Sequence, residues 1–271
     1  MTTPNTDDSS QRPFALVTGA SSGIGLELAR QFADNGFDVL ITAEDDELDK
    51  AAADLRATGA TVIAERADLA EPTGVEQLFQ AAKSTGRPIA AAALNAGVGA
   101  GGRFVEMDLD ADLRVVALNV ASTVHLAKLL VRDMGTRGEG RLLFTSSIAA
   151  TVPGPYYATY GASKAFIQSF AQAIRYELKD SGVTVTSLMP GPTDTEFFER
   201  ADMTDTAADS GKKDDPADVA RDGFEALMAG KDQVVAGSVK NKAQTAAGKA
   251  LPDTVTAGMT AKLTKPGSGD S

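Results

Sequence analysis

The sequence predicts a doubly wound α/β domain, in which a parallel β-sheet carries helices on both faces. Short apolar runs rich in β-branched residues alternate with segments of helical spacing along most of the chain. The apolar runs are continuous rather than alternating, as in strands that are covered on both faces. A length of 271 residues with 43% apolar residues suits one large domain with a buried core.

We assign one strand to each apolar run and one helix to each segment with helical spacing. In the first helix, for example, Ile24, Leu28 and Phe32 recur every four residues and so share one face. The predicted strands are residues 14–18, 38–42, 61–64, 89–94, 141–146 and 183–189, with a possible edge strand at 233–236. The predicted helices are residues 24–35, 46–58, 75–83, 110–134, 162–181 and 216–229.

The two ends of the chain differ from this central pattern. Residues 1–12 are polar and acidic, and we expect a disordered leader there. The domain itself is expected at 13–239. Residues 240–271 form an extension with five lysines and two aspartates, in which 240–263 should be irregular or helical and 264–271 disordered.

Composition excludes several kinds of chemistry. The chain has no cysteine and a single histidine, His125, so a Cys/His metal site and a His-dependent triad are both excluded. A net charge of −11 disfavours binding to nucleic acid or to anionic membranes. No run approaches the ~20 apolar residues of a membrane span, and no signal peptide is recognisable. We therefore expect a soluble cytoplasmic protein that uses another side chain as its base.

A glycine-rich turn follows the first strand and opens the first helix, with the sequence TGASSGIG at 18–25. A dinucleotide pyrophosphate needs backbone N–H groups at a helix N-terminus and no Cβ in its way. Gly19, Gly23 and Gly25 meet this need, and Ser21 and Ser22 add donors. The spacing differs from GxGxxG. Taken alone, such a motif could instead form a tight turn between strand and helix that binds no ligand.

A tyrosine–lysine pair and a serine predict the chemistry. Tyr160 and Lys164 are four residues apart and so share one helical face. An ammonium beside a tyrosine lowers its pKa and makes it a usable acid and base. Thirteen residues upstream, Ser147 lies at the carboxyl end of a predicted parallel strand, where such sheets bind ligands. Alone, a YxxxK pair is usually a solvated helix face.

Taken in order, these motifs resemble those of the short-chain dehydrogenase/reductase superfamily, from about residue 13 to residue 237. The matching motifs are TGxxxGIG at 18–25, Asp68, Asn95-Ala96-Gly97, Asn119, Ser147, Tyr160 with Lys164, and Pro190-Gly191 followed by Thr193 and Thr195.

The resemblance implies a role for each matched position. Tyr160 would be the general acid/base, Lys164 would lower its pKa and bind the nicotinamide ribose, and Ser147 would orient the carbonyl. Asn119 would hold the water of a proton relay, although it could instead be a helix-interior residue bonded to backbone. The implied cofactor-binding residues are Gly19, Ser21, Ser22, Gly23, Ile24, Gly25, Glu44, Asp68, Leu69, Asn95, Ala96, Gly97, Tyr160, Lys164, Pro190, Gly191, Thr193 and Thr195.

Cofactor choice depends on the end of the second strand. The aspartate typical of NAD enzymes is replaced by Ala43, and the arginine typical of NADP enzymes is replaced by Glu44. Five acidic residues between 44 and 49 would repel a 2′-phosphate. We therefore favour NAD over NADP, with Glu44 accepting from the ribose hydroxyls. Two alternatives remain: the acids could simply cap the next helix, and Arg66 could reach a phosphate.

The reaction expected is hydride transfer between a nicotinamide cofactor and a ketone or secondary alcohol. The substrate wall is expected from residues 98–104, 149–157 and 193–215, which suggest a neutral or hydrophobic substrate unless Arg103 binds a carboxylate. A non-catalytic dinucleotide-binding regulator, and a dehydratase or epimerase on the same fold, are the alternatives. The resemblance also implies a homo-oligomer formed through the long helices at 110–134 and 162–181.

Overall fold

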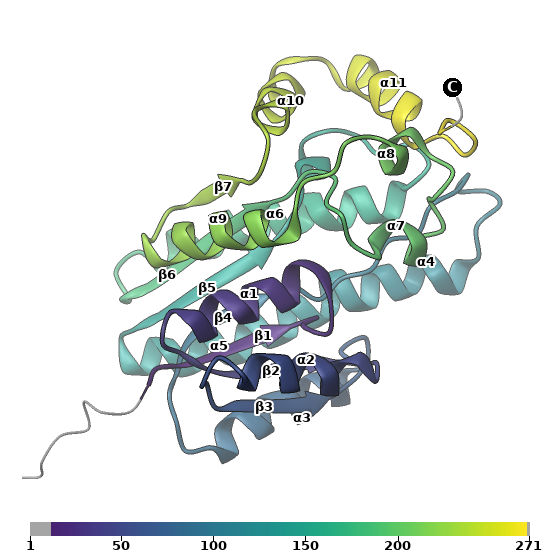
Figure 1. The fold of residues 1–271 in the computed structure, drawn as a ribbon. Helices are drawn as coiled ribbons and strands as arrows, with labels where there is room; N and C mark the ends of the chain where they lie inside the picture. The colour runs from purple at the N-terminus through teal and green to yellow at the C-terminus, as the bar shows by residue number, and fades with distance from the viewer. Residues whose placement is uncertain (1–11, 270–271) are drawn as a thin grey trace, which may run out of the picture.

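The computed structural model describes residues 12–269, which form a seven-stranded parallel sheet between two layers of helices (Figure 1). The strand order is β3-β2-β1-β4-β5-β6-β7, which confirms the predicted doubly wound α/β fold. The strands are β1 (Phe14–Thr18), β2 (Asp38–Ala43), β3 (Val62–Arg66), β4 (Ile89–Leu94), β5 (Gly140–Thr145), β6 (Val183–Met189) and β7 (Gln233–Val235).

The chain reverses its direction across the sheet between β1 and β4. β1 pairs with β2 on one side and with β4 on the other, with Thr18 opposite Thr42 and Val17 opposite Ala93. At this point the connections leave the sheet in opposite directions, so a crevice opens at the carboxyl ends of the strands. The Thr18 hydroxyl accepts 2.9 Å hydrogen bonds from the backbone N–H groups of Asn95 and Ala96, and these bonds fix the two strand ends together.

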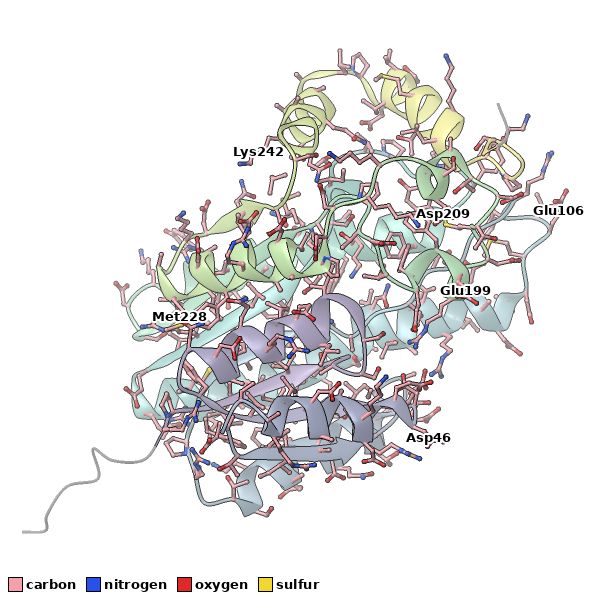
Figure 2. All side chains as sticks on the ribbon, in the orientation of Figure 1. Asp46, Glu106, Glu199, Asp209, Met228 and Lys242 are labelled. Carbon is pink, nitrogen blue, oxygen red and sulfur yellow. The ribbon has the colours of Figure 1, made fainter. Side chains whose placement is uncertain are left out.

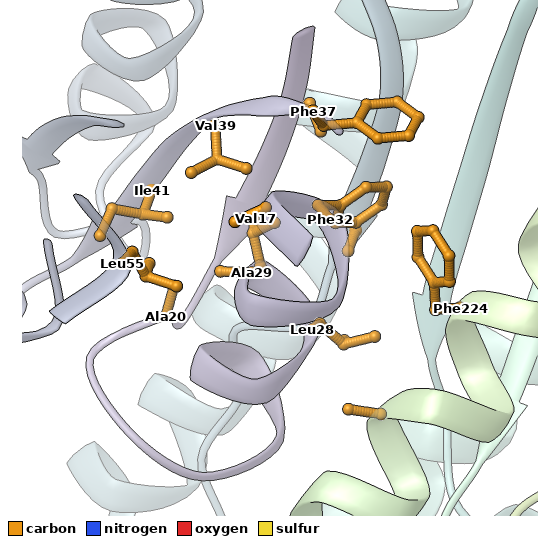
Figure 3. Close-up of a cluster of buried hydrophobic side chains, with 14 of the residues drawn as sticks. Val17, Ala20, Leu28, Ala29, Phe32, Phe37, Val39, Ile41, Leu55 and Phe224 are labelled. Carbon is orange, nitrogen blue, oxygen red and sulfur yellow. The ribbon is translucent and has the colours of Figure 1, made fainter. Parts of the chain in front are cut away.

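One face of the sheet is covered by α1 (Gly23–Asp34), α2 (Glu47–Arg56) and α9 (Pro216–Met228). Their apolar faces pack on the strands, and Phe32 of α1 lies between Phe37 and Phe224, with ring centroids 5.2 Å from each (Figure 3). The opposite face is covered by α3 (Pro72–Ser84), α5 (Thr123–Arg137) and α6 (Ala158–Glu177). The central strands β1, β2, β4, β5 and β6 are therefore buried on both faces along nearly all of their length, as the continuous apolar runs predicted, whereas the edge strands β3 and β7 are partly exposed.

The helix predicted at 110–134 is not uniform. It consists of α4 (Leu109–Val115), a π-helical segment η2 (Val116–Ser122) and α5. Such segments accommodate an extra residue and are frequent at functional sites. Asn119 lies in η2, and its side chain bonds the backbone of Val98 on a neighbouring loop. A pattern of apolar spacing does not predict this tertiary contact, because the contact is made by a polar side chain of the helix.

The other predicted elements are present with ends that shift by a few residues. The largest shift is that of α6, which begins at Ala158 rather than at 162 and so includes Tyr160 in its first turn. Five short or C-terminal elements were not predicted individually. They are η3 (Ile148–Thr151), α7 (Phe197–Arg200), α8 (Ala207–Ser210), α10 (Val239–Ala250) and α11 (Asp253–Thr264).

The continuous helical stretch Leu109–Arg137 is long and apolar enough, by length and composition, to cross a membrane, contrary to the sequence expectation. Its mean hydropathy over the most apolar window is 1.4. The sequence expectation considered unbroken runs of apolar residues. A mean hydropathy over a window can be high even when the window contains polar residues such as Asn119 and His125. Of this window, 44% is buried inside the fold.

Both ends of the described chain are more ordered than expected. Residues 1–11 and 270–271 lie outside the described residues, but Arg12 of the expected leader donates to the carbonyls of Gly59 and Ala33. The expected boundary between 239 and 240 falls within α10. Residues 264–269 end α11 and form a turn whose Gly267 and Gly269 N–H groups bond to Asp205, so the expected disorder is corrected there.

Candidate active site

A single cleft at the carboxyl ends of the strands collects nearly all of the predicted site residues. Its accessible volume is about 290 Å³. All of the residues expected to bind the cofactor line this cleft, together with Ser147. Asn119 does not line it and lies directly behind the wall, 1% exposed. The doubly wound topology brings these residues together because each follows a strand that ends at the same edge of the sheet.

The glycine-rich turn fits a dinucleotide pyrophosphate. A Cβ on Gly25 would lie 1.8 Å from the Gly19 carbonyl oxygen, so only glycine permits this close turn. Gly19 has φ +64°, and a Cβ there would meet the backbone of Ala96 at 2.9 Å. Ser22 caps α1 without a side-chain hydrogen bond to its first N–H groups. The N-terminus of α1 therefore presents backbone donors to the cleft, where they can bind phosphate.

Asn95 holds the strand ends that frame this turn. Its side-chain amide donates to the Thr18 and Gly19 carbonyls at 3.3 Å, and its Oδ1 accepts a 3.0 Å hydrogen bond from the Thr145 hydroxyl. These contacts connect the ends of β1, β4 and β5. Asn95 therefore shapes the floor of the cleft. Gly97 lies beside Asn119 and Lys164, and its missing side chain keeps the space next to them open.

The acidic segment after β2 is arranged differently from the sequence prediction. Glu44 forms an ion pair with Arg114 of α4, and the same guanidinium contacts both carboxylate oxygens of Asp68. Asp45 instead turns to the glycine loop, where it accepts a 2.9 Å hydrogen bond from the Ser21 hydroxyl. The second carboxylate oxygen of Asp45, Oδ1, is buried without a hydrogen-bond partner among the described residues. Asp45 lines the cleft and the sequence analysis did not select it.

The alternative phosphate ligand, Arg66, is not near the cleft wall. It forms ion pairs with Asp46 and Asp49 and is absent from the residues that line the cleft. Arg103, the alternative carboxylate ligand, pairs with Glu106 on an exposed loop. Asp46 and Glu106 project from the outer surface in Figure 2. Neither arginine is placed to bind a ligand in this cleft.

The loop after β6 crosses the mouth of the cleft and contacts the glycine loop. Arg200 pairs with Glu196 at 2.7 Å and with Asp45 at 3.7 Å, and Ser22 donates to Glu196 at 3.3 Å. Thr195 lies against Gly23, since a Cβ there would be 2.9 Å from the Thr195 methyl carbon. Residues 195–200 therefore cover the position that the glycine loop reserves for phosphate.

Ser147 and Tyr160 meet at the inner end of the cleft. Ser147 lies two residues after the end of β5 and caps η3, where its hydroxyl oxygen accepts a hydrogen bond from the Ala149 N–H at 3.1 Å. Burial raises the pKa of Tyr160 strongly, while its side-chain hydrogen bond with Ser147 lowers that pKa in part. The neighbouring Ser146 is 1% exposed and donates to the Lys164 carbonyl, so Ser147 is the serine placed for chemistry.

Lys164 lies beside the Tyr160 ring and is held there by the backbone. Its Nζ donates a 2.9 Å hydrogen bond to the Thr145 carbonyl and lies 5.7 Å from the centroid of the Tyr160 ring. Burial lowers the pKa of Lys164 itself to about 8. The low-dielectric interior disfavours both charged forms, the ammonium and the tyrosinate.

The Asn119 side chain is hydrogen-bonded to the backbone, which was the alternative to a role in a proton relay. Its Oδ1 accepts from the Val98 N–H at 2.9 Å, and its Nδ2 donates to the Val98 carbonyl at 2.9 Å and to the Ser163 hydroxyl at 3.0 Å. It therefore fixes the loop after β4 against α6, at the residue next to Lys164.

The substrate end of the cleft is apolar and partly differs from the expected wall. Val98, Ala149, Val152 and Tyr157 line it, whereas Pro153, Pro155 and Tyr156 do not. Tyr160 packs between Tyr157 and Phe197, with ring centroids at 5.8 and 5.0 Å. Burial raises the pKa of Tyr157 to about 12, so this ring stays neutral. Four C-terminal residues that the sequence analysis did not select also line the cleft: Gln244, Thr260, Leu263 and Thr264.

The comparisons with known proteins agree with this geometry. Residues 13–205 match the family model for short chain dehydrogenases. The chain is 38% identical over 193 residues to a 1-deoxy-11-beta-hydroxypentalenate dehydrogenase of Streptomyces exfoliatus, covering 70% of each protein. It is 31% identical over 207 residues to the oxidoreductase UcpA of Salmonella typhimurium, covering 76% of each.

Two solved structures with bound cofactor have the same fold. One is a short-chain dehydrogenase from Sphingobium yanoikuyae in complex with NADPH, with a TM-score of 0.77, 29% identity and coverage of 82% of this chain and 87% of that chain. The other is a short chain dehydrogenase/reductase from Burkholderia phymatum in complex with NAD, with a TM-score of 0.78, 26% identity and coverage of 83% and 89%. The chain belongs to the short-chain dehydrogenase/reductase superfamily of oxidoreductases.

Proposed function

We propose that this protein transfers hydride between a nicotinamide cofactor and a neutral ketone or secondary alcohol. The observation that carries the proposal is the juxtaposition of Ser147, Tyr160 and Lys164 with the glycine loop in one cleft. A nicotinamide bound there supplies or accepts the hydride. The chain has to position a carbonyl carbon beside it and to exchange one proton with the carbonyl oxygen.

Tyr160 and Ser147 perform the proton chemistry in this proposal. In the direction of reduction, the Tyr160 hydroxyl gives its proton to the oxygen that becomes the alcohol, and Ser147 donates a hydrogen bond to the same oxygen. In the direction of oxidation, Tyr160 takes the proton back. Lys164 binds the ribose hydroxyls, and Asn119 fixes the loop after β4. The buried Tyr160 and Lys164, with shifted pKa values, support this assignment.

The proposed cofactor preference is for NAD, with Asp45 rather than Glu44 as the residue that discriminates. The unpartnered Oδ1 of Asp45 is an acceptor that a ribose hydroxyl can satisfy. A 2′-phosphate in the same place would lie against this carboxylate and be repelled. Two arginines lie near this corner and both are already paired. Arg200 pairs with Asp45 and Glu196, and Arg114 pairs with Glu44 and Asp68. Bound cofactors in the related structures include both NADPH and NAD.

The proposed substrate is apolar because the wall beyond Tyr160 is built from Val98, Val152, Tyr157, Phe197 and Met203. The name of the Streptomyces relative describes the oxidation of a hydroxylated compound, which agrees with a secondary alcohol as one partner. A regulator that binds the cofactor without chemistry would not need Tyr160, Lys164 and Ser147 together in the cleft.

We also propose a cytoplasmic homo-oligomer. Exposed apolar side chains on α4 and α6 support the assembly, since such patches mark interaction surfaces. These side chains are Leu109, Leu113, Phe166 and Tyr176. Analytical ultracentrifugation of the wild type and of Phe166→Glu tests it: the wild type should sediment as a dimer or tetramer and the variant as a smaller species. A monomeric wild type would contradict this assembly.

The first experiment is calorimetric titration of the purified protein with NADH and with NADPH at fixed salt. We expect NADH to bind more tightly. The titration is followed by reduction of 2-decalone, a neutral bicyclic ketone, with the preferred cofactor. If neither cofactor binds, the proposed function is wrong. If NADPH binds more tightly, only the assignment of Asp45 is wrong.

A further inference from the structure

The C-terminal helices complete the substrate end of the cleft. α10 and α11 lie beyond the residues that match the family model, which end at 205. In Figure 1 they form the yellow end of the chain, on the same side of the molecule as α7 and α8. Gln244 of α10 and Thr260 of α11 line the same cleft as Tyr160.

This part of the chain is built into the fold at both ends. At the start of α10, Asn241 is 3% exposed and donates to Asp214 at 2.6 Å and to the Ala236 carbonyl at 3.0 Å. At the end of α11, the Thr264 hydroxyl donates to the Pro155 carbonyl at 2.8 Å. In between, a Cβ on Gly248 would lie 2.8 Å from Val152, so α10 packs closely on η3. The wall is therefore fixed in place.

α11 faces the protein with threonines rather than with apolar residues. Thr256, Thr260 and Thr264 recur every four residues and are all buried, while Val255 and Met259 are exposed. The hydroxyls of Thr256 and Thr264 bond to backbone carbonyls. The Thr260 side chain is only 7% exposed, yet its hydroxyl has no hydrogen bond to any other residue in the described part of the chain.

Gln244 is the second polar side chain of this wall without a partner. It is partly buried, and within residues 12–269 its amide makes no hydrogen bond. The lining residues around these two groups, Val152, Tyr157, Met203 and Leu263, supply no charge. Polar groups in an otherwise apolar wall that have no partner within the protein are available to a ligand that enters the cleft.

These groups need an acceptor of their own. A carbonyl oxygen has two lone pairs, and Tyr160 and Ser147 use both in the proposed reaction. Thr260 and Gln244 therefore remain available to bond a second oxygen of the same ligand. We propose that Gln244 and Thr260 are specificity-determining residues that bind a second neutral oxygen on an otherwise apolar ketone or alcohol. The substrate class is thus a dioxygenated apolar compound such as a diketone or hydroxyketone, and this inference rests on the proposed function.

The test compares substrates that differ by one oxygen. The 1,5- and 2,6-diones of decalin are measured against 1-decalone and 2-decalone with the preferred cofactor. The kcat/KM of each dione is divided by two, because a dione offers two carbonyls for reduction. The corrected kcat/KM of the wild type should be about tenfold higher for at least one dione than for the decalones. The reason is that a site built to bond an oxygen discriminates against a substrate that lacks it. Thr260→Val and Gln244→Leu should reduce this preference to threefold or less, measured as the ratio of kcat/KM for the dione to that for the decalone.

A matched control separates recognition from folding. Thr256→Val makes the same change one helical turn earlier, at a buried threonine that does not line the cleft. It should keep the full preference for the dione. A wild type without the preference, a preference that survives both Thr260→Val and Gln244→Leu, or an equal loss in Thr256→Val would overturn the inference. The inference would also be overturned if the protein bound NADH but reduced none of the four ketones. A lack of cofactor binding would instead overturn the proposed function itself.

Discussion

The Ser21 hydroxyl donates a 2.9 Å hydrogen bond to the Asp45 carboxylate and so joins the glycine-rich turn to the loop that leaves β2. This contact leaves the other Asp45 oxygen buried and unpartnered at the edge of the cleft. The adjacent Glu44 is held by Arg114 instead. Two consecutive acids that both line the cleft therefore have different partners, Arg114 for Glu44 and Ser21 for Asp45.

Asp45→Ala should change the cofactor preference. Loss of the carboxylate removes the repulsion of a 2′-phosphate, so NADPH affinity should rise about tenfold, the effect of ~1.4 kcal/mol. NADH affinity should fall severalfold because a ribose hydrogen bond is lost. Calorimetry with each cofactor measures both changes. Asp46→Ala, the same substitution at the neighbouring residue that pairs with Arg66, is the control and should leave both affinities unchanged.

Tyr160→Phe should remove most of the turnover without preventing cofactor binding. A general acid/base typically contributes a factor of about 10²–10⁴, and phenylalanine keeps the ring packing with Phe197. Initial rates of 2-decalone reduction and an NADH titration report the two properties separately. Tyr176→Phe, at an exposed tyrosine on the same helix, should behave as the wild type. A Tyr160→Phe protein with near-normal rates would disprove the catalytic assignment.

Gly25→Ala should abolish NADH binding. A Cβ at this position would lie 1.8 Å from the Gly19 carbonyl oxygen, so the turn has to open and its N–H groups move. The control is Gly135→Ala in α5, where a Cβ meets nothing within 4 Å. That variant should bind NADH normally and be slightly more stable, because alanine is the better helix former. Normal binding by Gly25→Ala would show that the turn does not hold the cofactor.

Lys164→Met should stabilise the cofactor-free protein at neutral pH, and the gain should depend on pH. Burial lowers the pKa of Lys164 from 10.5 to about 8, so the folded state holds this proton less tightly than the unfolded chain. The charged lysine therefore costs stability fully below pH 8, on the order of 3 kcal/mol. This cost shrinks as the pH rises from 8 to 10.5, where the unfolded chain also loses the proton.

Urea unfolding of the wild type and of Lys164→Met at several pH values measures this difference directly. The other titrating groups are common to both proteins and cancel. The stability advantage of the variant should be largest at pH 7 and smallest above pH 10. An advantage that is independent of pH would mean that the Lys164 pKa is not lowered in the folded protein.

The two directions of the reaction should respond differently to pH. Because burial raises the pKa of Tyr160, the hydroxyl stays protonated at neutral pH and is ready to act as an acid. Oxidation needs the deprotonated form, whose fraction rises about tenfold for each pH unit below the pKa. We expect kcat/KM for 2-decalol oxidation to rise steeply from pH 7 to 9, while ketone reduction stays nearly constant. A flat oxidation profile would exclude Tyr160 as the base.

The sequence by itself determined the fold class and most of the cleft. Continuous apolar strands and 3.6-residue helical spacing are local patterns, and they specify a parallel sheet covered on both faces. Gly19, Gly25, Ser147 and Tyr160 each follow or flank a strand end. Because the carboxyl ends of parallel strands share one edge, their order along the chain already brings these residues together.

Only the tertiary structure decided which partner each of several like residues contacts. Glu44 and Asp45 are equivalent in sequence, and the position of Arg114, 70 residues later, separates them. The burial that raises the pKa of Tyr160 and lowers that of Lys164 likewise comes from packing around both residues. Gln244 and Thr260 reach the cleft because Asn241 and Thr264 anchor α10 and α11 to distant loops. Such contacts depend on residues far apart in the chain, which local spacing does not encode.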